Sequence, residues 1–413
     1  MMEKIIVSCG SCGQKLRVPG GGDFDAKCPK CGFSWTINDY FRALLSEETD
    51  FNKSFDSVYQ EKMPDFNDCV NIALVGKVSA GKSSLLNAIF QRGRNDQIAQ
   101  VGASSGVTTK VTSYKLEKDV FISDCPGLED IRKENSEETK KFIENIDIGV
   151  FVVTGSADLS QKTNFDDLKK SCQNVIVVLN KADEWDQLDD SALHEVIAQW
   201  KIALNVQEIF PTTTKGFDPK QRKDAPMDVR GVDVLREKMF FFLKSMKKDL
   251  QFARQMREKS KYATGIISGA LLAVSAEAFI PGSAVYITAT QVVSIVSLNY
   301  LYTGNTLNKT AALAMLPQFA GQTVGTTAFL WIKSFLPPTG VIDIAAAAVA
   351  ASITFAMLSA VKWMLENGKS LDDGKMLIDM FSHYKNIWGK NKFKNESEIR
   401  NAALNLQSAI SLK

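Results

Sequence analysis

The chain has 413 residues, enough for two or three domains, and its 49 basic and 47 acidic side chains give a net charge of only +2. This balance excludes the strong positive field of a protein that binds nucleic acid through charge alone. Seven cysteines, four of them clustered near the start, indicate a reducing compartment and not a disulfide framework. The apolar run at residues 5–7 is too short for a signal peptide, so we expect a cytoplasmic location.

The first 38 residues predict a zinc ribbon. Cys9 and Cys12 form one C-x-x-C pair, and Cys28 and Cys31 form a second pair fifteen residues later, which is a spacing typical of structural zinc sites. Four thiolates suit a tetrahedral Zn²⁺, and so small a segment needs a metal to fold. A redox dithiol pair is the alternative. The segment resembles bacterial zinc-ribbon modules, which implies a docking function, and we expect an unidentified protein effector as its partner.

Residues 39–68 mix aromatic and charged side chains and predict a connector. Phe41, Leu44 and Leu45 lie at helical spacing, so we expect a short amphipathic helix within it.

The next segment carries a phosphate-binding loop. Residues 76–83 read G-K-V-S-A-G-K-S, which fits the pattern G-x-x-x-x-G-K-[ST], and they lie between an apolar, strand-like run and a helix-like run. In such a loop the backbone amides surround the phosphates, the lysine reaches the β and γ oxygens, and the serine hydroxyl binds Mg²⁺. The expected nucleotide contacts are therefore Gly76, Ser79, Ala80, Gly81, Lys82, Ser83 and Ser84.

Two further motifs predict the magnesium and γ-phosphate contacts. Asp124 and Gly127 form a D-x-x-G pattern after a strand-like run, so the carboxylate can hold Mg²⁺ through water and the glycine N–H can sense the γ-phosphate. Upstream, the small and polar segment 106–110 contains Thr108 and Thr109, either of which could close on the metal while the γ-phosphate is present.

The base is predicted to be guanine. Asn180, Lys181 and Asp183 belong to an N-K-A-D motif that follows the apolar run at residues 175–179. The Asp183 carboxylate can accept hydrogen bonds from the two N–H groups of guanine, whereas adenine would leave that charge unpaired. We expect Asn180 as a second base reader and therefore rejection of ATP. A weaker motif adds Thr213, Thr214 and Lys215.

In the order of these motifs the chain resembles the Era-like GTPases of the translation-factor-related class, roughly over residues 69–248. The resemblance implies an α/β domain over residues 69–250, with a six-stranded, mostly parallel sheet and helices on both faces. It favours Thr109 as the magnesium ligand, because Lys110 matches the basic residue of a Thr-Arg pair in that family. Lys82, Thr109 and Gly127 are then the candidate catalytic residues.

The chain departs from its relatives at two positions. Leu128 stands where Ras-like enzymes place the Gln that orients the attacking water, so we expect slow intrinsic hydrolysis. Ser79 replaces the Asn of potassium-activated relatives but matches dynamin-like proteins, whose serine helps to hold a monovalent cation. Potassium therefore stays open as a cofactor beside GTP, GDP, Mg²⁺ and Zn²⁺. A homodimer formed through the nucleotide faces is the expected activating partner.

Residues 251–413 predict a separate all-α domain. The stretch 263–361 contains only four charged side chains in 99 positions, and small residues dominate it. It resembles the YcjF-like domain that follows Era-like GTPase domains. The matching features are Ile280-Pro281-Gly282, the helix that ends at Leu301-Tyr302-Thr303-Gly304, and the turn Pro337-Pro338-Thr339-Gly340. The mixed-charge tail at residues 362–413 is expected to cap the bundle.

A soluble bundle and a membrane-inserted domain both stay open for this region. The segments 284–302 and 344–361 approach the length of a spanning helix, but Thr288, Gln291 and Ser294 would be costly against lipid. The leading hypothesis is a GTP-hydrolysing switch whose nucleotide state controls the helical domain. The alternatives are a dynamin-like membrane-remodelling GTPase and a ribosome- or RNA-associated GTPase, although the near-neutral charge argues against a nucleic-acid partner.

Overall fold

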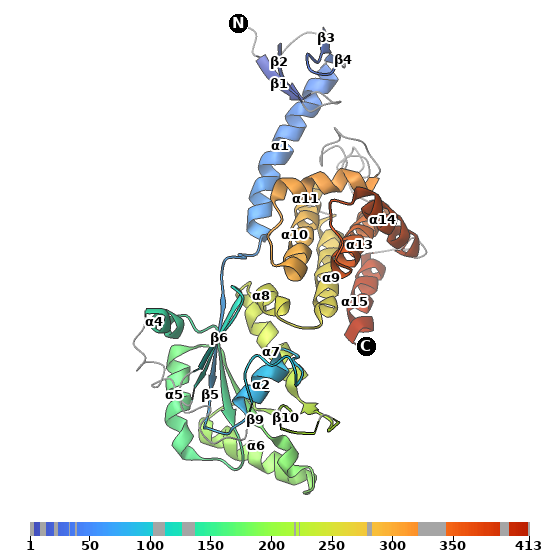
Figure 1. Ribbon diagram of the computed structural model, residues 1–413. Helices are drawn as coiled ribbons and strands as arrows, with labels where there is room; N and C mark the ends of the chain where they lie inside the picture. Colours follow the sequence, from blue (N-terminus) through green and yellow to red (C-terminus); the bar gives the residue numbers. More distant parts are fainter. Residues whose placement is uncertain are drawn as a thin grey trace. The chain divides into compact units, whose positions relative to one another are not determined.

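The structure, a computed structural model, describes residues 4–8, 14–19, 24–32, 34–37, 39–101, 112–125, 137–218, 220–222, 224–278, 283–320, 344–388 and 396–411. The chain divides into two compact units. One consists of residues 64–258, and the other combines residues 1–63 with residues 259–413. Each unit is built around its own layers of helices and strands (Figure 1).

A seven-stranded sheet forms the centre of the unit at residues 64–258, in the order β11-β10-β9-β8-β5-β7-β6. The strands β10, β9, β8, β5 and β7 are parallel, and β6 and β11 pair antiparallel at the two edges. Their bounds are β5 (Val70–Val75), β6 (Thr112–Leu116), β7 (Val120–Cys125), β8 (Ile148–Val153), β9 (Val175–Asn180), β10 (Phe210–Lys215) and β11 (Asp228–Arg230). The expected sheet had six strands, and the added one is β11, whose three residues pair with the end of β10.

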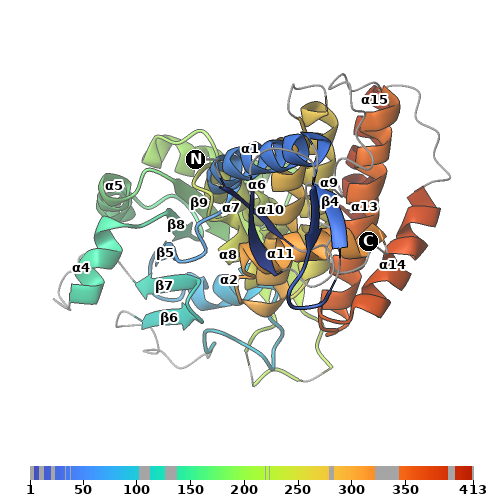
Figure 2. The same cartoon turned by 90° about the horizontal axis from the view of Figure 1, so that it is seen from above.

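Helices cover both faces of this sheet because successive side chains of the parallel strands point to opposite sides. On one face Val75, Phe151 and Leu179 share a core with Phe165 and Trp200 of the covering helices. The helices of this face are α4 (Glu137–Glu144), α5 (Lys162–Ser171) and α6 (Asp190–Leu204). The opposite face carries α2 (Lys82–Ile89) and α7 (Val232–Ser245), which pack against each other and against β10. Figure 2 shows the strands lying between these helices.

The boundary of this unit lies beyond the expected residue 250. The short helix α8 (Asp249–Arg254) and the residues after it remain tied to the sheet. Arg254 forms ion pairs with Asp119 and Glu117 at the turn between β6 and β7, and the Gln255 side chain donates to Asp119 over 2.8 Å. The Gln251 side chain donates to the carbonyl of Asp65. These polar ties explain why the composition change at residue 263 is not the structural boundary.

The helical unit contains α1 (Asp39–Lys62), α9 (Lys259–Glu277), α10 (Ser283–Thr303), α11 (Lys309–Met315), α13 (Ile344–Glu366), α14 (Gly374–Trp388) and α15 (Glu396–Ser411), with the 3₁₀ turn η3 (Leu316–Ala320). Helix α10 packs against α1, α9 and α13, while α15 packs against α9 and α14 against α13. Figure 2 shows α9, α13 and α15 side by side. The tail therefore packs on the bundle through Leu377, Phe381 and Trp388 of α14, which are buried.

The segment expected as a connector is instead a helix of 24 residues that belongs to the helical unit. Phe51, Phe55 and Tyr59 recur every fourth residue, stack in sequence and are buried. At the end of α1, Lys62 donates to the buried carboxylate of Glu277 over 2.6 Å, and Thr290 donates to the same carboxylate. The apolar stripe of the expected short helix thus continues over residues 51–59, and this is why the whole helix packs into the core of the helical unit.

The amino-terminal segment forms two separate antiparallel hairpins. One pairs β1 (Lys4–Ser8) with β2 (Lys15–Pro19), and the other pairs β3 (Phe24–Lys27) with β4 (Ser34–Ile37). Each hairpin brackets one of the two C-x-x-C pairs.

The Arg254–Asp119 pair yields a prediction about the stability of the sheet unit. Arg254→Met leaves the Asp119 carboxylate, which is 1% exposed, without its cation, so we expect a loss of about 3 kcal/mol. Arg222→Ala removes an exposed pair with Asp224 and should leave the unfolding transition almost unchanged. Calorimetry would follow the unfolding transition of this unit in both variants. Equal shifts would contradict the proposed role of Arg254.

Candidate nucleotide-binding site

Two positions of the phosphate-binding loop require glycine because other atoms of the protein lie too close for a side chain. A Cβ at Gly76, directly after β5, would lie 2.2 Å from the carbonyl oxygen of Val152 on β8. Gly81 has a φ of +82°, and a Cβ there would lie 2.4 Å from the amide nitrogen of Asn180. The loop therefore fits between β8 and β9 only without side chains at these positions, which accounts for the glycine spacing in the sequence.

Lys82 is folded back into this loop. Its Nζ donates to the carbonyl of Gly76 over 2.9 Å and to that of Lys77 over 3.1 Å, and it lies 3.6 Å from Asp124 Oδ1. The side chain is only 3% exposed. A lysine held in this way carries its positive charge at the floor of the loop, where phosphate oxygens need it.

Ser83 and Asp124 lie together beside Lys82, as the sequence predicts. The Ser83 hydroxyl donates to Asp124 Oδ2 over 3.2 Å, while Oδ1 of this fully buried carboxylate makes no hydrogen bond within the described residues. Burial raises the pKa of Asp124, against the opposing effects of Lys82 and Ser83. A hydroxyl and a carboxylate oxygen that is not hydrogen-bonded are hard oxygen ligands of the kind Mg²⁺ prefers, so this donor set fits the ion. Thr108, Thr109 and Gly127 lie outside the described residues.

Asn180 joins the phosphate-binding loop to the neighbouring strand β10. Its amide nitrogen donates to the carbonyls of Ala80 and Gly81, over 3.0 and 3.4 Å. Its amide oxygen accepts from the hydroxyls of Thr212 and Thr214, both over 3.1 Å. Since both polar atoms of this fully buried side chain are engaged, Asn180 positions the loop. Base reading by Asn180 and by Asp183 stays a prediction.

Asp183 lies in the 3₁₀ turn η2 (Ala182–Trp185), directly after β9. Lys181, the residue before this turn, takes the left-handed conformation with a φ of +62° and so turns the chain out of the sheet. The Asp183 side chain is 20% exposed, and Lys215 Nζ lies 3.7 Å from its Oδ2. In the Thr213-Thr214-Lys215 motif, the Thr214 hydroxyl therefore hydrogen-bonds to Asn180, and Lys215 faces Asp183. Thr213 is buried in β10.

The structure adds site residues that the sequence reasoning missed. Lys77, inside the loop, forms an ion pair with Asp158, which follows β8 and caps η1 (Leu159–Gln161). This contact and the hydrogen bonds from Ser160 lower the pKa of Asp158 to about 2. Thr212 is the other missed residue. Neither showed a sequence signal, because Lys77 occupies a variable position of the motif and Thr212 lies 32 residues from its partner.

Ser79, the candidate cation-binding serine, lies on the exposed side of the loop. It has a φ of +66°, a conformation that Asn tolerates better than Ser.

The second C-x-x-C pair, Cys28 and Cys31, lies within the described residues. Gly32 has a φ of +75° and its N–H donates to the carbonyl of Cys28 over 2.9 Å, which closes the tight turn expected after a C-x-x-C pair. Cys28 is buried and Cys31 is exposed. Cys9 and Cys12 lie outside the described residues, so the four-thiolate arrangement stays a prediction.

A family profile described as "50S ribosome-binding GTPase" matches residues 71–181, from β5 to the N-K-A-D motif. This chain contains a P-loop GTPase domain. Its sequence is 27% identical to GTPase Der of Nitratiruptor sp. over 45% of this chain and 41% of that protein. It is 28% identical to GTPase Era of Campylobacter fetus over 36% of this chain and 48% of that protein. The chain spans less than half the length of these curated relatives.

Solved structures also match about half of this chain. The Era protein of Aquifex aeolicus bound to GDP·AlF₄⁻ matches with 19% identity and a TM-score of 0.28, over 50% of this chain and 68% of that chain. Toc33 from Arabidopsis thaliana matches with 15% identity and a TM-score of 0.31, over 48% of this chain and 93% of that chain.

The contact between Gly81 and Asn180 yields a prediction about the GTPase domain. Gly81→Ala adds a methyl group against the Asn180 amide and forces a left-handed alanine, so we expect GDP affinity to fall at least about tenfold. Gly155→Ala is the matched control, since Gly155 has a φ of +64° but a Cβ there would meet no atom of the described residues within 4 Å. Titration calorimetry with GDP distinguishes the two. An equal loss in both variants would mean that strain, and not the Asn180 contact, decides the affinity.

Proposed function

We propose that the protein binds GTP with Mg²⁺, hydrolyses it to GDP and phosphate, and acts as a nucleotide-dependent switch. The observation that carries the proposal is the convergence of Lys82, Ser83 and Asp124 at the ends of β5 and β7. In parallel sheets ligands bind at the carboxyl ends of the strands, and here the base-reading Asp183 follows the end of β9 in the same sheet.

Each residue has a distinct task in this proposal. Lys82 supplies positive charge to the β and γ phosphates, and Ser83 and Asp124 hold Mg²⁺, with Thr109 as the third expected ligand. The ion, when bound, neutralises charge that develops on the phosphate oxygens. Gly127 is expected to sense the γ-phosphate through its N–H group. Asn180 holds the loop in a fixed position relative to β10 while these groups act.

Base selection tests the assignment of Asp183. Asp183→Asn replaces two acceptors with an amide that can donate to the extra carbonyl of xanthine, so preference should move from GTP to xanthosine triphosphate by on the order of 10²-fold or more. Competition titration of the wild type and the variant with GTP, ATP and xanthosine triphosphate measures this. Equal affinity of the wild type for ATP and GTP would rule out guanine selection.

Hydrolysis is expected to be slow in the isolated subunit. Leu128 replaces the water-orienting Gln, and even enzymes that have this Gln turn over at only roughly 10⁻⁴–10⁻³ s⁻¹ without help. We propose that a second subunit, with a potassium ion near Ser79, supplies the missing activation. Activity per molecule should then rise with protein concentration, and it should rise further in potassium than in sodium.

The rate of phosphate release, measured at protein concentrations from nanomolar to tens of micromolar, shows how activity depends on concentration. Lys82→Ala should abolish activity at every concentration because it removes the charge beside the phosphates. If activity per molecule does not change with protein concentration and the GTP-analogue complex is monomeric, the dimer mechanism is wrong and another protein must activate hydrolysis.

The helical unit is the proposed target of the switch. The helical segments Ser283–Thr303 and Ala347–Glu366 are long and apolar enough to cross a membrane, yet 78% and 61% of their apolar stretches are buried within the protein. Gln291 of α10 donates to Thr354 of α13 over 2.8 Å in this core. A polar contact of this kind supports a protein-packed bundle in a cytoplasmic protein, with membrane association as the alternative.

A liposome experiment decides between these two states of the helical unit. If the bundle remains packed, the protein should stay in the supernatant after sedimentation with anionic liposomes, in GDP and in a GTP analogue alike. Sedimentation only with the GTP analogue would favour the dynamin-like, membrane-remodelling function. Sedimentation in both states would indicate a constitutively membrane-bound domain.

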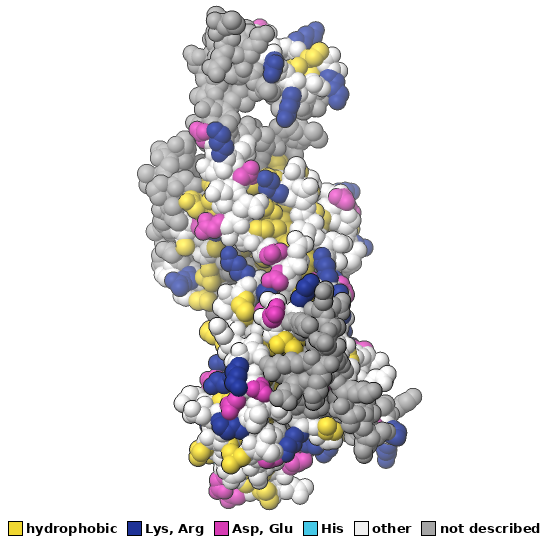
Figure 3. Space-filling view, turned by 90° about the vertical axis from the view of Figure 1, so that its left-hand side faces the viewer, with side chains coloured by type: hydrophobic (Ala, Val, Ile, Leu, Met, Phe, Trp, Pro, Cys, Tyr) yellow, Lys and Arg dark blue, Asp and Glu magenta, His cyan; other side chains and the backbone are white. Residues whose placement is uncertain are grey.

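The hairpins β1–β2 and β3–β4 are the proposed zinc ribbon, in which Cys9, Cys12, Cys28 and Cys31 would bind Zn²⁺. The turn at Gly32 supports this donor set, and docking of a protein effector is the proposed task. A ribosome- or RNA-associated role is the second candidate, because the matching profile is described as ribosome-binding. Figure 3 shows basic and acidic side chains interspersed on one face of the molecule, which argues against binding of nucleic acid through charge alone.

A further inference from the structure

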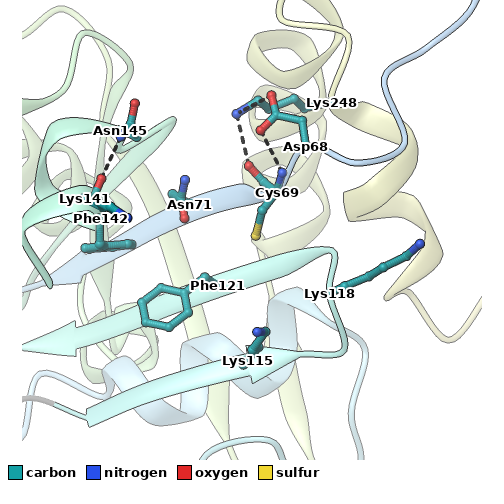
Figure 4. A pocket seen from close by; sticks show the side chains of 10 residues that line it. All are labelled: Asp68, Cys69, Asn71, Lys115, Lys118, Phe121, Lys141, Phe142, Asn145 and Lys248. Atoms are coloured by element: carbon teal, nitrogen blue, oxygen red, sulfur yellow. Dashed lines mark hydrogen bonds and ion pairs between the residues drawn. The ribbon is translucent and has the colours of Figure 1, made fainter. Parts of the chain in front are cut away.

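The GTPase domain contains a second cavity, at the opposite end of the strands that carry the nucleotide site. It has a volume of about 600 Å³ and is lined by residues from the starts of β5 and β7, the end of β6 and the helix α4 (Figure 4). Along β7, Phe121 of this cavity precedes Asp124 by three residues, or about 10 Å of strand. Along β5, Asn71 precedes Gly76 by five residues, or about 16 Å. A bound guanine nucleotide therefore leaves this cavity free.

The floor of the cavity is aromatic. The half-buried ring of Phe121 projects from β7 into the space drawn in Figure 4. Its centroid lies 5.1 Å from that of Phe142 on α4, at an interplanar angle of 56°. Phe142 is only 4% exposed and supports the first ring from behind. This arrangement presents one accessible apolar ring on a rigid base, which suits a flat apolar group of a ligand.

The rim of the cavity is positively charged. Lys115 lies opposite Phe121 in the β6–β7 register and so shares its face of the sheet, and Lys141 lies on α4 next to Phe142. Within the described part of the chain, no carboxylate lies at ion-pair distance from either exposed ammonium group. Lys248, by contrast, is neutralised by Asp68 and Asp147. Two lysines with no carboxylate partner among the described residues thus flank the aromatic floor.

We propose that this cavity binds a small organic phosphate, with its flat apolar group on Phe121 and its anionic group between Lys115 and Lys141. The volume lies in the range of sites that hold ligands of this size, and convergent polar groups around an apolar floor are their usual lining. Asn145 donates from its side chain to the carbonyl of Lys141 over 2.7 Å, which fixes the backbone that presents this lysine.

ADP is a suitable probe because it combines a flat ring with two phosphates and is rejected by a guanine-specific site. The 413-residue protein is first loaded with GDP and Mg²⁺ and freed of unbound GDP, which would compete for the cavity, and is then titrated with ADP, pyrophosphate and adenosine. We expect ADP to bind at least about tenfold more tightly than either half-ligand, since only ADP contacts both the floor and the rim. Equal affinity for ADP and pyrophosphate, or no ADP binding at millimolar concentration, would overturn the proposal.

Two double variants locate the binding. Lys115→Ala with Lys141→Ala should weaken ADP binding about tenfold or more, as expected when two charge contacts are lost. Lys169→Ala with Lys170→Ala removes two exposed lysines from α5 and should leave ADP affinity unchanged. GDP affinity should be the same in both, because neither pair lies near the phosphate-binding loop. ADP binding that survives the first pair would place the ligand elsewhere, including the nucleotide site, and would overturn the proposal.

Cys69 gives an independent readout of location, because its half-buried thiol lies in the wall of the cavity. Saturating ADP should slow alkylation of Cys69 by iodoacetamide several-fold, and this protection should disappear in the Lys115→Ala, Lys141→Ala protein. Peptide mass spectrometry follows the reaction, with the buried Cys172 of the same domain as the internal reference. An unchanged Cys69 rate with ADP bound would contradict occupation of this cavity.

Discussion

The amide of Asn180 is the contact on which the nucleotide site depends. It joins three segments that the chain brings together from far apart: the phosphate-binding loop at Ala80 and Gly81, the end of β9, and β10 through Thr212 and Thr214. A fully buried amide with all its partners satisfied stabilises one arrangement, because any shift of the loop leaves a polar atom unpaired. The loop geometry that places Lys82 and Ser83 is thereby set from a neighbouring strand.

The motifs of the site could be predicted from the sequence, and the contacts that hold them could not. The glycine spacing, Lys82, Ser83, Asp124 and Asp183 follow from what phosphate, metal and guanine require chemically. The partners of Asn180 and Lys77 lie 32 to 100 residues away in the chain and belong to no local pattern. Pairing over such separations is decided by the sheet order, which brings β8, β9 and β10 together and which side-chain periodicity alone does not specify.

In the helical unit, too, the sequence predicts the elements but not the contacts between them. Its low charge and helix-length apolar runs were evident in the sequence, but the same composition serves a spanning helix and a core helix. Polar contacts between helices, such as Gln291 with Thr354, and the buried Glu277 shared by Lys62 and Thr290, support the proposed protein-packed bundle. The Glu277 contact also explains why α1 belongs to this unit, since its last residue supplies the cation for a carboxylate that would otherwise be buried without one.

The two ends of the GTPase sheet differ chemically because of how parallel strands are used. At the carboxyl ends lie the phosphate-binding loop with Lys82 and the carboxylate of Asp124, which are the proposed contacts of phosphate and Mg²⁺. At the opposite ends, the strand starts leave room between β6 and α4, where lysines surround an aromatic floor. β7 runs between the two, with Phe121 at one end and Asp124 near the other. In the sequence, β6 and α4 directly follow the segments at residues 102–111 and 126–136, which contain the candidate γ-phosphate sensors Thr109 and Gly127. Two walls of the second cavity, β6 and α4, are therefore adjacent in the sequence to those two segments.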